Sequence, residues 1–252
     1  MTAEKRKQKI SELLKVQDTV KVTELSNLFG VSEVTVRSYL EDMEKKGLLS
    51  RVHGGAVSSY KPYYSMNLTQ RLEANQKEKV EIAERIAALI ELNDTVMLNA
   101  GTTTLLAFRK FPADYSLNIV KNSISIALEA SSNPNYNVIL VGGSVDTKYQ
   151  FTYGSESASQ IRKYHADKLI LSVDGIDLQR GFTTYYDKEC CVDLAMIEQS
   201  KLCIVAADRS KLYRSAFAKI SDVSVAHCIV TNAPLESGLI RELEELGVKV
   251  LL

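Results

Sequence analysis

Residues 22–57 read VTELSNLFGVSEVTVRSYLEDMEKKGLLSRVHGGAV, and this stretch decides the fold of the first part of the chain. Its apolar residues recur at helical spacing on both sides of Gly30, which can supply the left-handed turn that ends a helix. Thr23 is placed to cap the helix before this glycine, and Ser32 to cap the helix after it. The sequence therefore predicts two short helices joined by a tight turn.

A first helix and a β-hairpin flank this pair of helices. Thr2 can cap a helix with an apolar stripe at Ile10, Leu13 and Leu14. Downstream, residues 48–52 and 56–57 have strand character on either side of His53-Gly54-Gly55. Together these elements are typical of a winged helix-turn-helix, whereas the alternative is a three-helix bundle with a surface hairpin.

The helix after Gly30 carries small, polar and cationic side chains that can approach base edges and phosphates. We expect DNA contacts from Ser32, Glu33, Val34, Thr35, Arg37, Ser38 and Tyr39, with Arg51 and His53 of the hairpin near the phosphate backbone. Tyr39 has two alternatives, a contact to DNA or packing inside the domain.

The net charge of the chain neither favours nor excludes DNA binding. The 252 residues hold 31 Lys and Arg against 31 Asp and Glu, and nucleic-acid-binding proteins are usually basic. Residues 1–58 hold 10 basic and 8 acidic side chains, a net charge of +2, which leaves −2 for the remainder. The interpretation as a DNA-binding protein therefore rests on motif and placement, and a weak electrostatic contribution predicts reliance on paired, specific contacts.

The composition also indicates which cellular compartment and which cofactors we expect. No apolar run approaches the roughly 20 residues needed to cross a bilayer, and no signal peptide is recognisable. Cys190, Cys191, Cys203 and Cys228 match no metal or redox spacing, and the three histidines are far apart in sequence. We expect a cytoplasmic protein with reduced thiols, no metal, no cofactor and no membrane partner.

Residues 59–76 contain Ser, Tyr and Pro without periodicity, and we interpret them as a linker between a DNA-binding domain (1–58) and a second domain (77–252). In the second domain, apolar strands alternate with helices, which indicates a buried parallel sheet of Rossmann-like α/β type. The predicted strands are 95–98, 117–120, 138–141, 168–173, 201–206, 227–230 and 248–251. Helices are predicted at 79–90, 123–130, 155–164, 191–198 and 236–246.

Ligands of such sheets bind at the carboxyl ends of the strands. The first of these ends reads Asn99-Ala100-Gly101-Thr102-Thr103-Thr104 before a helix, a pattern that suits a phosphate, although ordinary capping by threonine is the alternative. Other strand ends carry polar residues or glycines: Lys121, Asn122 and Ser123; Gly142 and Gly143; Asp174, Gly175 and Asp177; and Asp208 through Lys211. Their convergence on one edge predicts a site for a phosphorylated polyol.

The stretch 22–57 resembles the N-terminal domain of the DeoR family of bacterial transcription regulators, through its helix-turn-helix and its G-L-L-x-R-V-H-G-G-A wing. The family usually has Arg-Asp where this chain has Ser38-Tyr39, so the base preference of relatives does not carry over. The second domain is similar to the DeoR sensor domain through Gly101-Thr102-Thr103, Asn122-Ser123, Gly142-Gly143, Gly175-Ile176-Asp177 and Asp208 through Lys211.

That sensor domain is similar to ribose-5-phosphate isomerase, so the resemblance implies a sugar-phosphate-isomerase-type fold that senses sugar phosphates or related metabolites. The family often has Asp at the position of Asn99 and Thr at the position of Lys121. Both differences make the region less negative, and they predict that the protein tolerates or prefers an anionic effector.

The leading hypothesis is a repressor of a carbohydrate catabolism operon that binds double-stranded operator DNA as a homodimer or homotetramer and responds to a phosphorylated sugar. An alternative is a sugar-phosphate isomerase fused to a DNA-binding domain, with Asp174 and Asp177 as acid and base and Lys211 stabilising an enediolate. The segment after Asp177 lacks the glycine-rich stretch that resembles the isomerase's catalytic loop. A scaffold protein is disfavoured by the chemistry of the recognition helix.

Overall fold

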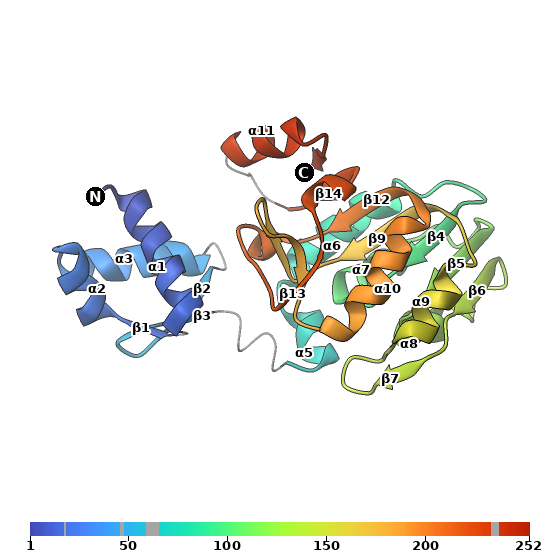
Figure 1. Cartoon of the computed structure of the whole chain (residues 1–252), viewed down its shortest axis with the longest axis horizontal. Helices are drawn as coiled ribbons and strands as arrows, with labels where there is room; N and C mark the ends of the chain where they lie inside the picture. The colour runs from blue at the N-terminus through green and yellow to red at the C-terminus, as the bar shows by residue number, and fades with distance from the viewer. Residues whose placement is uncertain (18, 46–47, 59–65, 233–236) are drawn as a thin grey trace. The chain divides into compact units, whose positions relative to one another are not determined.

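The computed structural model describes residues 1–17, 19–45, 48–58, 66–232 and 237–252. The chain forms two compact units, Met1–Met66 and Asn67–Leu252 (Figure 1). Among the described residues, no helix combines the length and apolar character that crossing a membrane requires. All four cysteines are free thiols.

The first unit is a winged helix-turn-helix. Its helices are α1 (Ala3–Gln17), α2 (Val22–Phe29) and α3 (Glu33–Lys45), and its strands are β1 (Thr19–Lys21), β2 (Leu49–Val52) and β3 (Gly55–Ser58). Gly30 ends α2 in the left-handed region at φ +62°, and its N–H donates to the Ser26 carbonyl, as the sequence predicts. The buried side chains Ile10, Leu25 and Val36 come from the three helices and meet in one core.

Two details of this unit differ from the prediction. Helix α2 begins at Val22, after Lys21, so Thr23 lies inside the first turn and does not cap it. Strand β1 was not predicted, because three residues carry too little pattern to be recognised. Its stability comes from pairing with β3, where Val20 lies opposite Ala56 in an antiparallel sheet of order β1-β3-β2.

The second unit is built on a seven-stranded sheet of order β15-β14-β12-β9-β4-β5-β6, in which all neighbours are parallel. These strands are β4 (Thr95–Leu98), β5 (Leu117–Lys121), β6 (Tyr136–Leu140), β9 (Ala166–Ser172), β12 (Ser200–Ala206), β14 (Cys228–Val230) and β15 (Lys249–Leu251). All seven lie where the sequence predicts them, within two residues at each end. The apolar runs were informative because both faces of a parallel sheet are covered.

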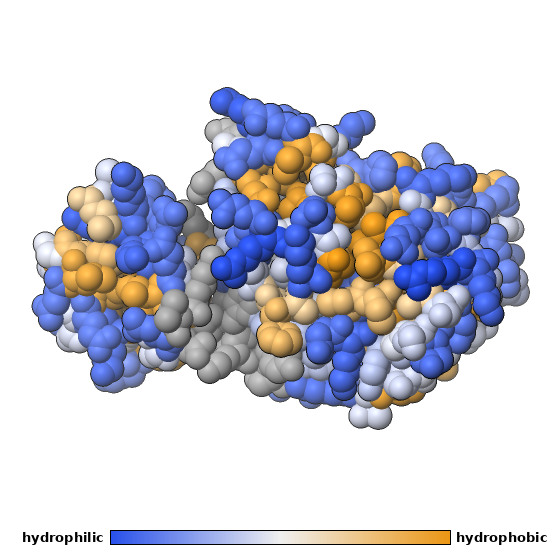
Figure 2. Space-filling view, viewed as in Figure 1, coloured by the Kyte–Doolittle hydropathy of each residue, from blue (hydrophilic) through white to orange (hydrophobic). Residues whose placement is uncertain are grey.

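Helices cover the two faces of this sheet. One face carries α6 (Gln76–Ala87), α7 (Thr102–Phe108) and α8 (Ile124–Ala130), and the other carries α9 (Ser155–Ile161), α10 (Asp187–Glu198) and α11 (Ser237–Glu245). In β9, Ile170 packs on the first face, whereas Leu169 and Leu171 pack on the second. Figure 2 shows α11 as hydrophilic on its outer side, with hydrophobic residues beneath it.

Smaller elements join this framework. Strands β10 (Gly175–Asp177), β11 (Gly181–Thr184) and β13 (Ala218–Ser221) form an antiparallel sheet, and β7 (Ser144–Asp146) pairs with β8 (Phe151–Tyr153). Two 3-10 turns, η1 (Arg209–Lys211) and η2 (Val223–Val225), follow strands.

The predicted linker, residues 59–76, needs correction at its C-terminal end. Helix α5 (Leu68–Glu73) lies inside it and belongs to the second unit. Asn67 caps this helix, because its side chain accepts from the N–H of Gln70 while the Gln70 side chain accepts from the N–H of Asn67. This capping box, Asn-x-x-Gln, is visible in the sequence and was missed.

Candidate nucleic-acid interface and effector site

Helix α3 exposes one polar face and buries the other. Val36, Leu40 and Met43 lie in the core. Of the predicted contact residues, Ser32, Glu33, Val34, Arg37 and Ser38 are exposed. Thr35 is half-buried, and its N–H donates to the Ser32 hydroxyl over 3.2 Å, so Ser32 caps α3 as predicted. Val34 is 76% exposed, an apolar group free to contact a thymine methyl.

The side chains of Arg37 and Tyr39 make different contacts. The Arg37 guanidinium lies 3.2 Å from the Glu33 carboxylate one turn earlier, and both side chains are about half exposed. Such a pair is weak and can be exchanged for a phosphate or a guanine edge. Tyr39 is half-buried against the core, and its hydroxyl accepts from the Arg6 guanidinium of α1 over 3.1 Å. Tyr39 therefore packs inside the unit and is not part of the exposed face.

A groove of about 390 Å³ lies between α3 and the wing. Arg37, Arg51 and His53 line it, so three of the predicted DNA-contact residues meet around one concavity. Arg51 is also bound to α3, because its Nε donates to the Glu44 carboxylate over 2.7 Å and its backbone N–H donates over 2.8 Å. Arg37 and Arg51 thus line the groove while each is paired with a carboxylate of α3, and the contacts of Glu44 join the wing to α3.

In the second unit, Asn99 joins three elements at the carboxyl end of the sheet. Its Nδ2 donates to the Ser172 carbonyl (2.9 Å) and to the Asp193 carboxylate (3.2 Å), and its Oδ1 accepts from the Ser172 N–H (2.8 Å). A Cβ at Gly101 would lie 2.5 Å from the Ser172 Cβ, so only glycine permits this close approach of β4 to β9. Asn99 and Gly101 thus hold the strand ends together.

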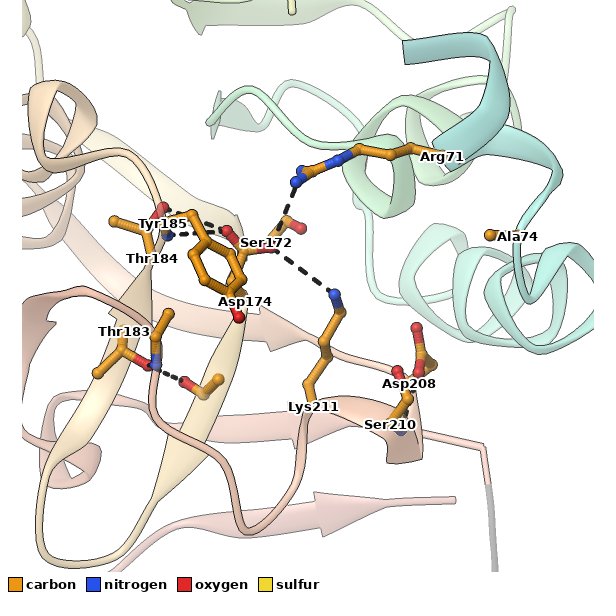
Figure 3. A network of polar contacts seen from close by, with 12 residues as sticks. Arg71, Ala74, Ser172, Asp174, Thr183, Thr184, Tyr185, Asp208, Ser210 and Lys211 are labelled. Atoms are coloured by element: carbon orange, nitrogen blue, oxygen red, sulfur yellow. Dashed lines mark hydrogen bonds and ion pairs between the residues drawn. The ribbon is translucent and has the colours of Figure 1, made fainter. Parts of the chain in front are cut away.

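Asp174 is the centre of a polar cluster that draws on distant parts of the chain (Figure 3). Its Oδ1 lies 3.9 Å from Nη1 of Arg71 and 3.7 Å from Nζ of Lys211, and all three side chains are about nine-tenths buried. Its Oδ2 accepts from the Tyr185 N–H over 3.0 Å. The predicted convergence of Asp174 and Lys211 at one sheet edge is therefore present in the fold.

Arg71 is the site residue that the sequence did not reveal. It lies on α5, its guanidinium donates to the Tyr186 hydroxyl over 3.1 Å, and it lies 4.8 Å and 5.4 Å from the ring centroids of Tyr149 and Tyr186. Lys79 is buried behind it and donates to the carbonyls of Arg71 and Ala74, which completes the end of α5. Recognition of the capping box would have placed Arg71 on a helix of this domain.

The threonines after Gly101 divide into two roles. Thr104 is fully buried and donates to the carbonyls of Asn99 and Gly101 (2.9 and 2.8 Å). This role is structural, but it is not the capping by threonine that the sequence left open, because the N-cap of α7 is Gly101 and has no side-chain cap hydrogen bond. The hydroxyls of Thr102 and Thr103 have no hydrogen-bond partner among the residues that the structure describes. Both stand at the start of α7, where backbone N–H groups also lack helical acceptors.

The structure does not bring Lys121 to this cluster. Its side chain is fully buried, its ammonium lies 3.3 Å from the Ile126 carbonyl and 5.5 Å from the ring of Phe108 at the far end of α7. Burial lowers its pKa to about 7. Lys121 therefore does not supply the positive charge that the sequence assigned to the effector site, whereas Asn99 lies at the strand ends beside Asp193.

Other predicted effector residues lie in loops with structural contacts. Asn122 donates to the Thr152 carbonyl (3.1 Å), and Ser123 caps α8 by accepting from the Ile126 N–H (3.3 Å). Gly142 binds α9 through Gln160 and Ser157, and Gly143 follows it at φ +143°.

Gly175 lies opposite Thr183 in the small antiparallel sheet. The Asp177 carboxylate accepts from the N–H groups of Gln179 and Arg180 in the hairpin turn. Asp177 therefore does not join Asp174 as the second carboxylate that the isomerase alternative requires.

Residues 74–233 match the DeoR C terminal sensor domain, and residues 6–61 match the DeoR-like helix-turn-helix domain. The chain belongs to the DeoR family. A DeoR protein of this arrangement is a transcription regulator with a DNA-binding unit and a sensor unit, and not an enzyme.

Similar DeoR regulators cover nearly the whole chain. It is 32% identical over 250 residues to the uncharacterized HTH-type transcriptional regulator YulB of Bacillus subtilis, with 99% of this chain and 96% of that protein aligned. It is 35% identical to the transcriptional repressor AccR of Agrobacterium fabrum, covering 90% and 89% of the two chains. Among solved structures, ribose 5-phosphate isomerase A of Methanocaldococcus jannaschii aligns over 55% of each chain with a TM-score of 0.40 and 13% identity.

Proposed function

We propose that this DeoR regulator represses a carbohydrate catabolism operon and is controlled by a phosphorylated sugar that binds at the Asp174 cluster. The main support is that two buried cations, Arg71 and Lys211, lie beside the carboxylate of Asp174 at the carboxyl end of β9. Guanidinium and ammonium groups donate charge-assisted hydrogen bonds, which a phosphate accepts more strongly than a hydroxyl does.

The hydroxyls of Thr102 and Thr103 supply further donors for that phosphate, and both belong to the strand end next to Asp174. Arg71 lies on the first helix of the sensor unit, four residues after its capping residue Asn67. A phosphate that draws the guanidinium of Arg71 away from Asp174 therefore acts on α5, the first helix after the boundary between the two units. Only such a difference in contacts between two states can change DNA affinity.

On the DNA side, we propose that α3 enters the major groove of operator DNA in a dimer or tetramer, with the groove of Arg37, Arg51 and His53 on the phosphate backbone. The function requires the cytoplasm, where operator DNA is accessible. The name of a similar protein, the putative aga operon transcriptional repressor of Escherichia coli O157:H7 (31% identical, 100% of this chain and 94% of that protein), supports repression of an operon.

The test measures affinity for the DNA upstream of the protein's own gene by fluorescence anisotropy at fixed salt. Arg37→Ala is expected to weaken binding by about 1–3 kcal/mol, whereas Lys9→Ala, which removes a comparable surface ion pair on α1, is expected to change it little. Unchanged operator affinity in Arg37→Ala excludes this residue from the interface.

The second arm adds phosphorylated sugars and their unphosphorylated forms to the complex. One phosphorylated sugar is expected to change operator affinity about tenfold or more, and Arg71→Met is expected to reduce this response. Arg109→Met is the matched control, because Arg109 pairs with Glu129 on the surface of the same unit at 2.6 Å. If no phosphorylated sugar alters operator binding, or if Arg71→Met responds like the wild type, the effector proposal is wrong.

A further inference from the structure

The two edge strands of the seven-stranded sheet, β15 and β6, differ in how they are protected. Edge strands are ordinarily kept from pairing with other chains by shortness, by charged side chains or by proline. β15 has only three residues and begins with an exposed lysine. β6 has five residues, YNVIL, without a charge or a proline, and Figure 1 shows it at the rim of the second unit. The edge of β6 is therefore open to pairing with a further strand.

The register of β6 on β5 shows which backbone groups of β6 bond to the sheet. The Asn135 carbonyl accepts from the Leu117 N–H over 3.3 Å, and the Val141 N–H donates to the Lys121 carbonyl over 2.9 Å. In a parallel pair, every second residue directs both its N–H and its C=O to the same neighbour. The odd-numbered residues of β6 therefore bond to β5, and the even-numbered ones direct their backbone groups away from the sheet.

Three even-numbered residues form this outer edge. The N–H groups of Val138 and Leu140 face outward, and no acceptor for either lies in the part of the chain that the structure describes. The carbonyls of Tyr136, Val138 and Leu140 face the same way. The Tyr136 N–H is already used, because it donates to the Asn133 carbonyl over 3.2 Å. β6 thus offers two donors and three acceptors to an added strand.

The surface beside this edge is apolar. Leu140 is 41% exposed, and it lies on the same sheet face as Val138, which packs on the core under α8. Leu128 of α8, the helix that contacts β6 on this face, is 75% exposed. Glu129 is the one charged residue of α8, and the Arg109 guanidinium holds it over 2.9 and 2.6 Å. No unpaired charge of α8 therefore opposes the approach of an apolar surface.

We infer that two copies of this chain pair through β6, in antiparallel order about a twofold axis at Val138. In this register Val138 lies opposite Val138 of the second copy, and Leu140 lies opposite Tyr136. The outward N–H groups of Val138 and Leu140 in both copies then face the outward carbonyls of Val138 and Tyr136. A shift by one residue places inward-directed groups of one strand at the interface, so the alternation along the edge fixes the register.

A second copy suits this edge better than a different strand does. The donors and acceptors of β6 are complementary to those of the same strand in the reverse direction, and such a contact closes on itself as a dimer. Pairing of β6 with β15 of another copy leaves a further edge open and forms a growing chain. The inference goes beyond the proposed function, which requires two copies without saying where they meet.

Helix α8 enlarges the contact. A stable interface buries about 800 Å² per partner, which is more than the edges of two short strands supply. The twofold axis stands perpendicular to the paired sheets, so α8 of both copies lies on one face of a continuous sheet, on either side of the axis. We therefore expect the exposed Leu128 side chains to add apolar area there.

Sedimentation equilibrium of the full chain, without DNA or sugar, measures the association. The wild type is expected to be a dimer or tetramer between about 1 and 100 µM. Leu140→Pro deletes an outward N–H and removes no hydrogen bond to β5. Leu140→Ala is the matched control, because it shortens the side chain and keeps that N–H. Leu140→Pro is expected to associate about tenfold or more weakly than Leu140→Ala, so that a dimer becomes a monomer and a tetramer a dimer.

A second pair of variants tests the part played by α8. Leu128→Lys is expected to weaken the association about tenfold or more, because two like charges are brought to the axis. Leu202→Lys is the control, since Leu202 is 41% exposed on β12, in the interior of the same sheet. Wild-type association of Leu128→Lys overturns the arrangement with α8 at the axis.

Cysteine cross-linking tests the register, and it decides the matter if thermal melting shows that Leu140→Pro does not fold. Residues opposite each other in a hydrogen-bonded pair have Cα atoms about 5.5 Å apart, so Val138→Cys is expected to give a disulfide-linked dimer with diamide. Asn137→Cys is the control, because its Cα atoms lie about 8 Å apart in this register, beyond the reach of a disulfide. Asn137 is more exposed than Val138, so random collision favours the control. The wild type, treated alike, shows what its own thiols contribute.

The outcomes separate this inference from the proposed function. A wild type that is monomeric over the whole range overturns the pairing. Equal association of Leu140→Pro and Leu140→Ala, both folded, also overturns it, as does cross-linking of Asn137→Cys that equals or exceeds that of Val138→Cys. The operator assay with phosphorylated sugars decides the proposed function separately, because copies that associate through another surface still bring two DNA-binding units together.

Discussion

Replacing Asn99 by aspartate tests how the strand ends of the sensor unit are held together. The Asn99 amide donates to the Ser172 carbonyl (2.9 Å) and to the Asp193 carboxylate (3.2 Å), so Asn99→Asp turns a donor into an acceptor that faces two acceptors. The other oxygen still accepts from the Ser172 N–H. The substitution changes volume little, and its effect is therefore electrostatic.

The distance between the two side chains allows the free energy of their repulsion to be compared with that of protonating Asp193. Two ionised carboxylates at about the 3.2 Å separation of these atoms repel by roughly 5 kcal/mol at an effective dielectric constant of about 20. Burial raises the pKa of Asp193 to about 7, so protonating it at pH 8 costs only about 1.4 kcal/mol. Protonation of Asp193 costs less free energy than the repulsion of two ionised carboxylates, so we expect Asp193 to be protonated in the variant. The Ser172 carbonyl also loses its donor, which costs about 1–3 kcal/mol in a buried position.

We therefore expect Asn99→Asp to lower the free energy of unfolding by about 3 kcal/mol at pH 8 and by about 2 kcal/mol at pH 5. The sign follows from linkage: a carboxyl whose folded-state pKa is raised holds its proton more tightly when folded, so stability falls as pH rises from about 4 to about 7. In the wild type, Asp193 is already protonated at pH 5, and the variant then avoids the cost of adding that proton.

Urea unfolding of the wild type and the variant at the two pH values measures this difference. The double variant Asn99→Asp with Asp193→Asn restores one amide opposite one carboxylate, and it is expected to recover part of the lost stability. Asn137→Asp is the control, because Asn137 is exposed at the edge of the same sheet. A loss that is equal at both pH values, or a double variant no more stable than Asn99→Asp, would refute the pairing of Asn99 with Asp193.

Three further outcomes follow from the same contacts. Gly101→Ala places a carbon 2.5 Å from the Ser172 Cβ and is expected to cost about 1–3 kcal/mol of unfolding free energy, measured by urea unfolding. Asp94→Ala leaves the ammonium of Lys168, 2.6 Å away and 8% exposed, without its buried partner, and a loss of about 3 kcal/mol is expected in the same measurement. Lys121→Met is expected to leave the response of operator binding to phosphorylated sugars unchanged in the anisotropy assay, because Lys121 is enclosed beside Phe108; an altered response would return it to the effector site.

Local pattern sufficed for much of the fold. The glycine turn at Gly30 and the helical spacing around it predict the helix-turn-helix, and the apolar runs predict all seven strands of the parallel sheet. These signals lie within single elements, since a left-handed turn favours glycine and a strand buried on both faces is apolar throughout. Strand β1 and the sheet of β10, β11 and β13 were not predicted, because pairing between distant short segments stabilises them.

The sequence by itself predicted that Asp174 and Lys211 follow strands of one parallel sheet, and so that they lie at the same edge of it. Only the tertiary structure decided that Arg71, on a helix hidden in the predicted linker, completes this cluster, and that Lys121 lies outside it. It also decided that Asn99 is the partner of Asp193, 94 residues away. The physical reason is that the charge of a site is the sum over side chains brought together by packing, whereas a sequence shows each strand end alone.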